Sequence, residues 1–316
     1  MTGGNSTPTL NQSVKMMGTI ITLTLEHPKP KPIMAECIRL LHVYEHRFSA
    51  NDDHSELMQL NHQSGRAPYR IHPEVYKLIK LGKFYSRFPN GNLNIAIGPL
   101  VKTWHIGFSD AKVPTAQQIE TALSLTDPQN IILDDSNNTV FLRKKGMEID
   151  LGSLAKGFIG DLIIHYLQTQ HVEHALLNLG GNVLALGSNT SRNGQPWRIG
   201  IQDPAKKLGE YCTIIPAQNQ SVVTSGIYQR NLTVGEHFYH HIFNRKTGYP
   251  VQTSIASLTI VSDKSVDGEI WTTILFGKPL ITIMEAVALL DGIFAIVITC
   301  DGQAYDSRVF KRASTS

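Results

Sequence analysis

The chain has 316 residues, a formal net charge of +3 and 41% hydrophobic residues. This length allows a continuous apolar core, and nearly balanced charge without a long run of Lys or Arg argues against nucleic acid as a partner. The three cysteines, Cys37, Cys212 and Cys300, are far apart, which argues against a disulfide framework or a metal cluster and favours buried small side chains. No segment is long and apolar enough to predict a membrane span.

Residues 1–13 are rich in Ser, Thr, Asn and Gly, which predicts a disordered lead-in before a folded domain over residues 14–310. The chain as given has neither a basic start followed by an apolar stretch nor a cysteine near its first residue that could carry a lipid. We therefore expect a cytoplasmic protein, with export of a longer precursor as the open alternative.

The first half of the chain predicts strands and helices in turn. Residues 17–27 alternate β-branched and polar side chains, as in a strand, whereas residues 34–47 and 72–87 have the apolar spacing of helices. Residues 130–152 predict two short strands, joined by a turn at Asp135–Asn138.

The second half predicts a helix after Gly152, then two buried strands broken by Gly180 and Gly181, and further strands. A strand, two helices and a strand complete the chain, over Ser257–Val261, Val266–Phe276, Leu280–Leu290 and Ile293–Thr299. Because strands and helices mix without a regular βαβ alternation, we expect the α+β class, with mixed sheets and packed helices in one large domain or two intimately packed lobes.

The segment MEIDLGSLAKGFIGD, residues 147–161, is the strongest single candidate for a site. A strand is expected to end at Asp150, and a turn at Gly152 to precede a helix with Lys156 in its first turn. Free N–H groups, the helix dipole and an ammonium group together favour a bound phosphate. An aspartate that caps the helix beside a surface lysine explains this segment equally well.

Two further segments carry candidate residues. In YHHIFNRKTGYPV, His241 precedes a turn that contains Gly248; a histidine at a strand end is more often structural, but catalytic groups concentrate on such loops. In SVDGEIWTTILFG, the residues Asp267, Glu269 and Thr273 offer hard oxygen ligands that suit Mg²⁺. Taken alone, the two carboxylates are better explained as groups that stabilise a helix N-terminus.

These segments, in this order, resemble the ApbE family of FAD:protein FMN transferases from Met17 to about Ala304. The motifs that carry the resemblance are MGTIITLTL, EHRFSANDDHSELMQLN, NIAIGPLVKTWHIG, IDLGSLAKGFIGD, LLNLGGNVLALG, TSGIYQR and HHIFNRKTGYP. Each motif is weak alone, but together they are specific.

The resemblance implies a role for each matching residue. His241 would be the general base, and the backbone carbonyl of Ser153 would join the metal. The residues expected at the flavin nucleotide are Met17, Gly152, Lys156, Asn178, Gly180, Gly181, Asn182, Thr247 and Gly248.

The metal helix departs from the family pattern D-A-L-A-T-A-L-F, whose Asp and Thr are metal ligands four residues apart. Alignment of TILF without a gap places Glu269 and Thr273 at these positions, and residues four apart share a helix face. Asp267 is the alternative ligand, at the cost of a gap. Arg245 stands where proline is usual.

The implied reaction is a Mg²⁺-dependent transfer of FMN from FAD to a Thr or Ser hydroxyl of an acceptor protein, with release of AMP. Similar family members modify flavoproteins that carry a D-x-x-T-G-A-[ST]-like motif, so such a flavoprotein is the expected partner. Two alternatives stay open: an FAD pyrophosphatase that gives FMN and AMP, and a non-enzymatic FAD carrier.

Overall fold

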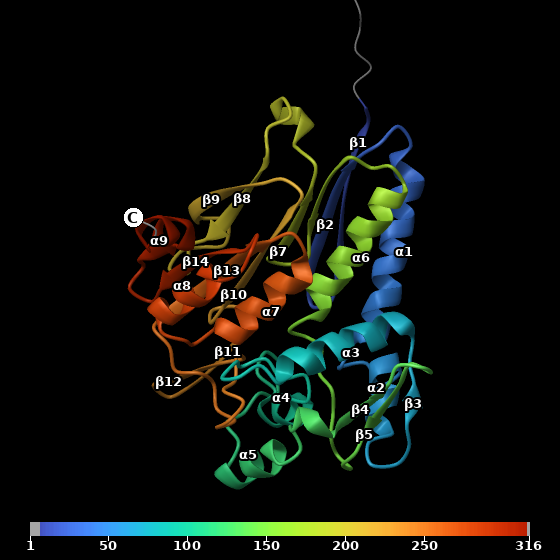
Figure 1. The fold of residues 1–316 in the computed structure, drawn as a ribbon, viewed down its shortest axis with the longest axis vertical. Coiled ribbons are helices and arrows are strands. Elements are labelled where there is room, and N and C mark those ends of the chain that lie inside the picture. Colours follow the sequence, from blue (N-terminus) through green and yellow to red (C-terminus); the bar gives the residue numbers. More distant parts are fainter. Residues whose placement is uncertain (1–6, 315–316) are drawn as a thin grey trace, which may run out of the picture.

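The computed structural model describes residues 7–314, and the side chains of residues 7–310. Its central element is an antiparallel sheet of eight strands, which fills the upper part of the molecule in Figure 1. In spatial order the strands are β1 (Thr9–Met16), β2 (Thr19–Glu26), β6 (His174–Asn178), β7 (Asn182–Leu186), β10 (Gln220–Gly226), β13 (Ile255–Ser262), β14 (Phe294–Thr299) and β15 (Ala304–Asp306).

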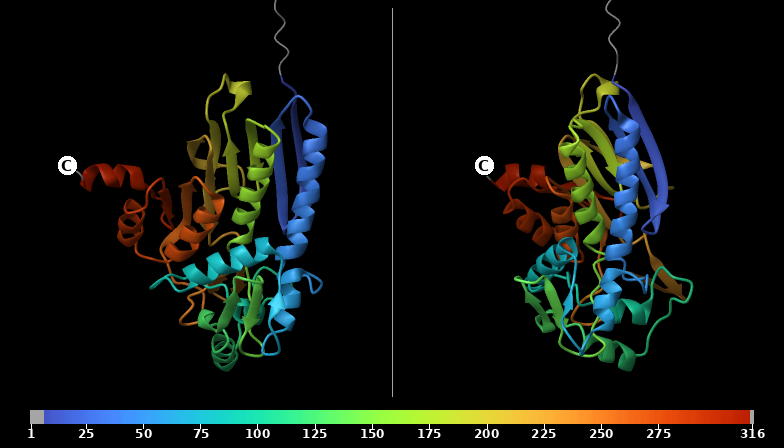
Figure 2. Two further views of the ribbon diagram at one scale, coloured as in Figure 1. Left: turned by 45° about the vertical axis from the view of Figure 1, so that its right-hand side comes forward. Right: turned by 90° about the vertical axis from the view of Figure 1, so that its right-hand side faces the viewer.

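Four helices cover one face of this sheet: α1 (Pro30–Phe48), α6 (Ala155–Thr169), α7 (Ser265–Leu275) and α8 (Leu280–Ala288). Figures 1 and 2 show α1 and α6 side by side on this face. The sequence explains the packing of α1, because its buried residues recur every three or four positions and form one apolar stripe. This stripe consists of Ile33, Cys37, Leu41, Tyr44 and Phe48.

The opposite face of the sheet is covered by the hairpin of β8 (Trp197–Gln202) and β9 (Tyr211–Ala217). Ile199 and Ile215 of the hairpin pack in one cluster with Val261 of β13. The eight residues of β13 are all buried, as expected for a strand with both faces covered.

The lower part of Figure 1 contains a small sheet and four helices. The sheet has the order β3 (Tyr69–Arg70), β5 (Thr139–Leu142) and β4 (Ile131–Asp134), and the helices are α2 (Glu56–His62), α3 (Pro73–Ser86), α4 (Gly98–Trp104) and α5 (Ala116–Leu123). Leu57 and Leu78 from this part belong to the same buried cluster as Leu23 of β2. The two parts therefore share one core and form one domain.

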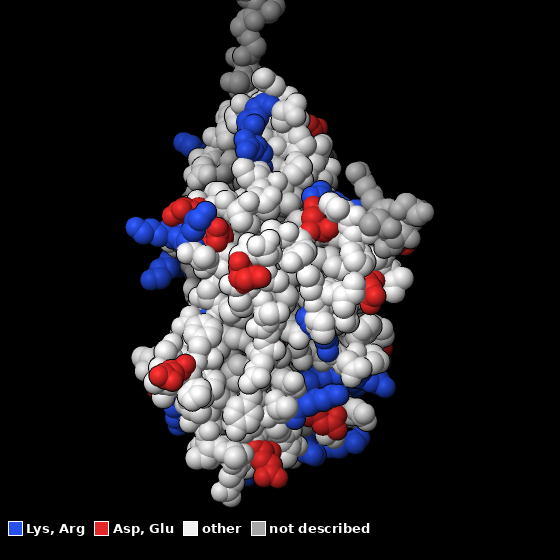
Figure 3. Space-filling model, turned by 90° about the vertical axis from the view of Figure 1, so that its left-hand side faces the viewer, with Lys and Arg blue, Asp and Glu red and all other residues white. Residues whose placement is uncertain are grey.

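The remaining elements are short. They are the hairpin of β11 (Asn231–Val234) and β12 (His237–His240), the 3₁₀ turns Pro128–Asn130 and Thr190–Arg192, and the C-terminal helix α9 (Ser307–Ser314). In the part of the chain that is described, no helix is long and apolar enough to cross a membrane. On the face shown in Figure 3, basic and acidic side chains are separated by wide uncharged areas, and basic ones gather at its lower right.

The α+β class predicted from the sequence is confirmed, but two expectations are wrong. The lead-in expected over residues 1–13 extends too far, because Thr9–Ser13 belong to β1 and pair with β2 over Thr22–Glu26; residues 1–6 lie outside the described part. Burial was expected for the three cysteines, but only Cys37 is buried, and Cys212 and Cys300 are exposed.

Candidate functional site

A cavity of about 460 Å³ lies between α6, α7, the ends of sheet strands and the loops of the lower part. Such a volume is in the range of small-molecule and cofactor sites. The predicted site residues that line it come from segments far apart in the chain. They are Met17, Gly152, Ser153, Lys156, Asn182, His241, Glu269 and Thr273.

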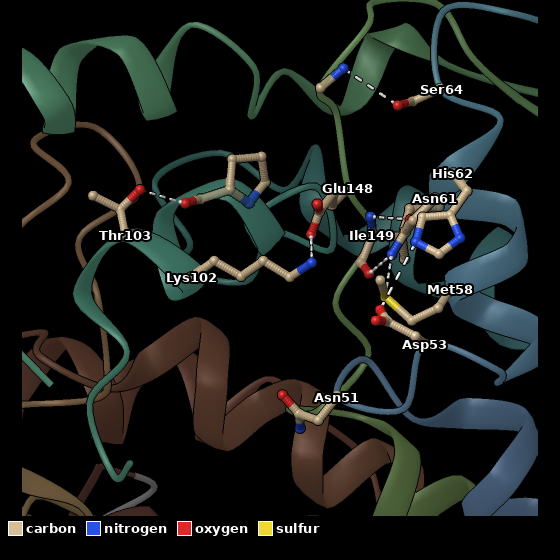
Figure 4. A network of polar contacts seen from close by, with 12 residues as sticks. Asn51, Asp53, Met58, Asn61, His62, Ser64, Lys102, Thr103, Glu148 and Ile149 are labelled. Atoms are coloured by element: carbon tan, nitrogen blue, oxygen red, sulfur yellow. Dashed lines mark hydrogen bonds and ion pairs between the residues drawn. The ribbon is translucent and has the colours of Figure 1, made fainter. Parts of the chain in front are cut away.

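The turn that precedes α6 is held in place from the lower part of the molecule. The buried side chain of Asn61 pairs with the backbone of Ile149, donating to its carbonyl oxygen at 3.0 Å and accepting from its N–H at 2.8 Å. Figure 4 shows this pairing beside the ion pair of Lys102 with Glu148. Residues 147–150 do not form the strand that the sequence predicts to end at Asp150, and Asn61 holds this irregular segment before Gly152 and the cavity.

The start of α6 does not have the aspartate cap that the sequence offered as the alternative explanation. Asp150 accepts a hydrogen bond from the Gly152 N–H at 2.7 Å but does not cap the helix, whose N-cap is Leu154. Burial raises the pKa of Asp150, and the hydrogen bond from Gly152 opposes this effect. Lys156, in the first turn, lines the cavity and offers its positive charge there.

Glu269 is the buried carboxylate of the site, with 7% of the residue exposed. Its Oε1 accepts from Nδ2 of Asn182 at 2.9 Å, and the Gly157 N–H also donates to this carboxylate. Burial raises the pKa of Glu269, whereas the charge of Lys156 and these two hydrogen bonds lower it. Thr273 lies one turn further along α7 and lines the same cavity.

Asp267 does not line the cavity, although it lies only two residues before Glu269. Its charge acts on Tyr85 of α3, whose pKa is raised by burial first and by Asp267 second. Two residues along a helix correspond to a rotation of about 200°, so the two side chains leave α7 on different sides. The geometry favours Glu269 and Thr273 over Asp267 as the pair that faces a ligand.

His241 follows β12 and lines the cavity. Its Nδ1 lies 3.2 Å from the carbonyl oxygen of Arg230. A carbonyl oxygen only accepts, so Nδ1 carries the proton and Nε2 keeps its lone pair. Burial lowers the pKa of His241 to about 4, and the nearby positive charges of Arg230 and Lys156 add to this effect. The imidazole is therefore neutral at pH 7 and can accept a proton.

The glycine turn between β6 and β7 supports the site without lining the cavity. Asn178 Oδ1 accepts from the N–H groups of Gly180 at 3.0 Å and Gly181 at 3.1 Å. Gly180 has a φ of +76°, and a Cβ there would lie 2.2 Å from Oγ1 of Thr19. Among these residues of the motif, Asn182 is the one that lines the cavity.

Thr247 and Gly248 also lie outside the cavity lining. The carbonyl of Gly248 accepts from Nε1 of Trp104 at 2.9 Å, and a Cβ on Gly248 would lie 2.5 Å from Ile119 of α5. Arg245 donates to the carbonyl of Phe88 at 2.9 Å and so joins this turn to the loop after α3. In this structure the turn packs against the lower part of the protein and does not cover the cavity.

Three charged residues that sequence reasoning did not assign also line the cavity: Glu45, Asp150 and Arg230. Glu45 accepts from the Met17 N–H at 2.5 Å and so fixes the turn between β1 and β2. Asp150 and Arg230 lie within quoted motifs and could have been singled out. Glu45 is the first residue of the motif EHRFSANDDHSELMQLN, but otherwise it looks like any polar residue of a helix.

The oxygen donors at this cavity fit a magnesium ion only together with a ligand. In residues 7–310, no three His, Cys, Asp or Glu side chains come close enough to hold a metal ion. Glu269, Thr273 and Ser153 offer one carboxylate and neutral oxygens. Mg²⁺ commonly takes one or two carboxylates and completes its shell with phosphate and water, so this donor set fits the ion.

The site is thus a nucleotide-sized cavity lined by a lysine at a helix start, by the carboxylates of Asp150 and Glu269, whose pKa values are raised by burial, and by a neutral histidine. The sequence profile of the ApbE family matches residues 17–297, and the chain belongs to this family.

Relatives and solved structures agree with this assignment. The chain is 39% identical over 287 residues to the FAD:protein FMN transferase of Klebsiella pneumoniae (91% of this chain, 88% of the relative), and 33% identical over 276 residues to that of Treponema pallidum (83% and 76%). Its fold is similar to the ApbE protein of Thermotoga maritima, with a TM-score of 0.86, 26% identity and coverage of 96% and 99%. The flavin transferase ApbE of Vibrio cholerae gives a TM-score of 0.82, with 26% identity and coverage of 97% and 99%.

Proposed function

We propose that this protein transfers FMN from FAD to a Thr or Ser hydroxyl of an acceptor flavoprotein and releases AMP. The observation that carries the proposal is the convergence of Lys156, Glu269 and neutral His241 on one cavity. The names of its relatives support a flavin transfer reaction. We expect the acceptor to carry a D-x-x-T-G-A-[ST]-like motif.

In this reaction, the acceptor hydroxyl oxygen forms a bond to the FMN-side phosphorus, and the bond from that phosphorus to the bridging pyrophosphate oxygen breaks. AMP leaves with the bridging oxygen. Nε2 of His241 takes the hydroxyl proton, because Nδ1 is committed to the carbonyl of Arg230. Lys156 places a positive charge beside the phosphates and so helps to bind and orient FAD.

Glu269 and Thr273, with the carbonyl of Ser153, would hold a Mg²⁺ ion. When bound, this ion neutralises charge on the pyrophosphate. Asn182 keeps the carboxylate of Glu269 at the cavity wall through its hydrogen bond to Oε1. Burial of the Glu269 carboxylate raises its pKa, and the charge of Lys156 and the hydrogen bonds from Asn182 and Gly157 oppose this effect.

The test is incubation of the protein with FAD, Mg²⁺ and an acceptor domain that carries the motif, followed by detection of covalent flavin fluorescence in a denaturing gel and of AMP. Transfer gives a fluorescent acceptor and one AMP per flavin attached. AMP and free FMN without labelled acceptor would show a pyrophosphatase, and bound but intact FAD would show a carrier. Either of these two results overturns the proposal.

A further inference from the structure

We propose that Ser265 is a positioning residue for Glu269 and acts through the side-chain amide of Asn182. This inference rests on the proposed function, because it takes Glu269 as the carboxylate that faces the metal and FAD. Ser265 begins α7 and Glu269 lies one turn later on the same helix. The two side chains are nevertheless joined by way of β7, through a residue more than eighty positions away.

Two consecutive hydrogen bonds connect Ser265 to Glu269, and in both of them the donor is on the Ser265 side. Ser265 Oγ donates to Oδ1 of Asn182 at 2.5 Å, and Nδ2 of Asn182 donates to Oε1 of Glu269 at 2.9 Å. Because Nδ2 of Asn182 donates to Glu269, the amide oxygen Oδ1 faces Ser265. The hydroxyl of Ser265 stabilises this orientation, because it supplies the donor that Oδ1 needs.

All three residues are buried, and Ser265 lies outside the cavity lining. Ser265 is 0% exposed, Asn182 is 2% exposed and Glu269 is 7% exposed. Solvent therefore cannot replace a lost hydrogen bond at low cost, and an amide without its partner would turn or leave Oδ1 unpaired. The orientation of Asn182, and through it the place of the Glu269 carboxylate, depends on the hydroxyl of Ser265.

The hydroxyl of Ser265 is available for this role because another residue caps α7. The N-cap residue Lys264 makes no side-chain cap. Asp161 of α6 instead accepts from the Ser265 N–H at 2.8 Å and the Val266 N–H at 3.0 Å. Ser265 thus has its backbone bound to α6 and its side chain bound to β7.

Close packing leaves these groups little freedom. A Cβ on Gly157 of α6 would lie 2.7 Å from Cγ of Glu269 and 2.7 Å from the carbonyl oxygen of Ser265. The glycine lets α6 and α7 approach until the Gly157 N–H reaches the Glu269 carboxylate. The Glu269 carboxylate therefore accepts hydrogen bonds from Gly157 on one side and from Asn182 on the other. Ser265 sets the orientation of the Asn182 amide.

The test compares Ser265→Ala with Ser221→Ala as a matched control. Ser221 is also buried and its hydroxyl also makes hydrogen bonds, but to Ser262 and not to Asn182. Calorimetric titration of Mg²⁺ into each protein saturated with FAD should show at least about a tenfold weaker affinity for Ser265→Ala, as is typical when an outer-shell partner of a ligand is lost. Ser221→Ala should bind Mg²⁺ like the parent protein, and FAD affinity without metal should be equal in all three proteins.

A crystal structure of metal-free Ser265→Ala provides a readout that does not depend on the reaction. We expect the hydrogen bond between Asn182 and Glu269 to be lost or the amide to be turned. An unchanged Asn182–Glu269 contact, or unchanged Mg²⁺ affinity, would overturn the positioning role of Ser265. If the parent protein binds FAD but no Mg²⁺ and the metal-free variant still loses the contact, the positioning inference stands and the metal-dependent function fails.

Discussion

Nδ1 of His241 lies 3.2 Å from the carbonyl oxygen of Arg230, and the backbone N–H of His241 donates to the same oxygen at 3.3 Å. This contact fixes the tautomer, because the carbonyl requires a proton on Nδ1. The pKa of His241 is lowered to about 4, mainly by burial. The residue is therefore unprotonated over the whole neutral range.

The first prediction concerns the pH dependence of transfer. A base must be unprotonated, so kcat/KM for FAD should rise with pH through about 4 and be level from pH 5.5 to 7.5, in contrast to a histidine of ordinary pKa near 6.5. His241→Ala should lose roughly 10²–10⁴-fold in kcat and keep FAD affinity. Steady-state rates across pH check this, and a parent-like rate for His241→Ala would assign the base to another group.

The second prediction separates the two carboxylates of α7. Glu269→Gln removes the charge that faces the cavity, so the Mg²⁺ concentration for half-maximal activity should rise more than about tenfold and be partly rescued by excess metal. Asp267→Asn is the matched control, because Asp267 does not line the cavity. The measurement is initial rate against Mg²⁺ concentration. If Asp267→Asn is the more damaging change, Asp267 is the ligand and the assignment of Glu269 is wrong.

The third prediction concerns Lys156. Its ammonium lines the cavity at the start of α6, so Lys156→Ala should weaken FAD binding about tenfold, or about 1.4 kcal/mol, and leave the fold intact. Lys77→Ala, an exposed lysine of α3, is the control for loss of charge alone. Titration followed by flavin fluorescence gives both affinities. Equal affinities for the two variants would remove Lys156 from the site.

The fourth prediction uses the buried cap of α7. Burial raises the pKa of Asp161 from 3.8 to about 6, while the hydrogen bonds from Val266 and Ser265 and the charge of Lys264 oppose it, and Asp267 adds to it. The folded state therefore binds more protons than the unfolded state between these pH values, and the contribution of Asp161 to stability falls as pH rises from about 4 to 6. This difference between the folded and unfolded pKa of Asp161 corresponds to roughly 3 kcal/mol of the free energy of unfolding at most.

Urea unfolding at pH 4 and pH 7 checks this sign. Asp161→Asn cannot titrate, so it should cost more stability relative to the parent at pH 4 than at pH 7. Asp135→Asn is the control, because the contact with Lys80 lowers the pKa of Asp135, so Asp135 titrates below this pH range and the cost of its substitution should hardly change between pH 4 and pH 7. A cost for Asp161→Asn that does not change with pH would show that Asp161 has an ordinary pKa in the folded protein.

Local spacing predicts the helices that carry the site, and the resemblance to the ApbE family selects part of its inner surface. The alignment of TILF without a gap selects Glu269 and Thr273, which share a helix face, and both line the cavity, whereas Asp267 does not. Lys156 was chosen for its place in the first turn of a helix, and it also lines the cavity. Both selections need the family motifs together with the helical period, which a sequence displays directly.

Only the tertiary structure could show which distant residues meet. Thr247 and Gly248 matched a motif, but their turn packs on Trp104 and α5, because the path of the chain and not the motif decides what a turn covers. Asp161 accepts a hydrogen bond from the start of α7, more than a hundred residues later in the chain. Asn182, on a strand of the sheet, joins Ser265 to Glu269. Such contacts depend on how α6, α7 and the sheet pack together. The sequence by itself determined the main helices and strands around the site, and the packing of these elements decided which polar groups share hydrogen bonds.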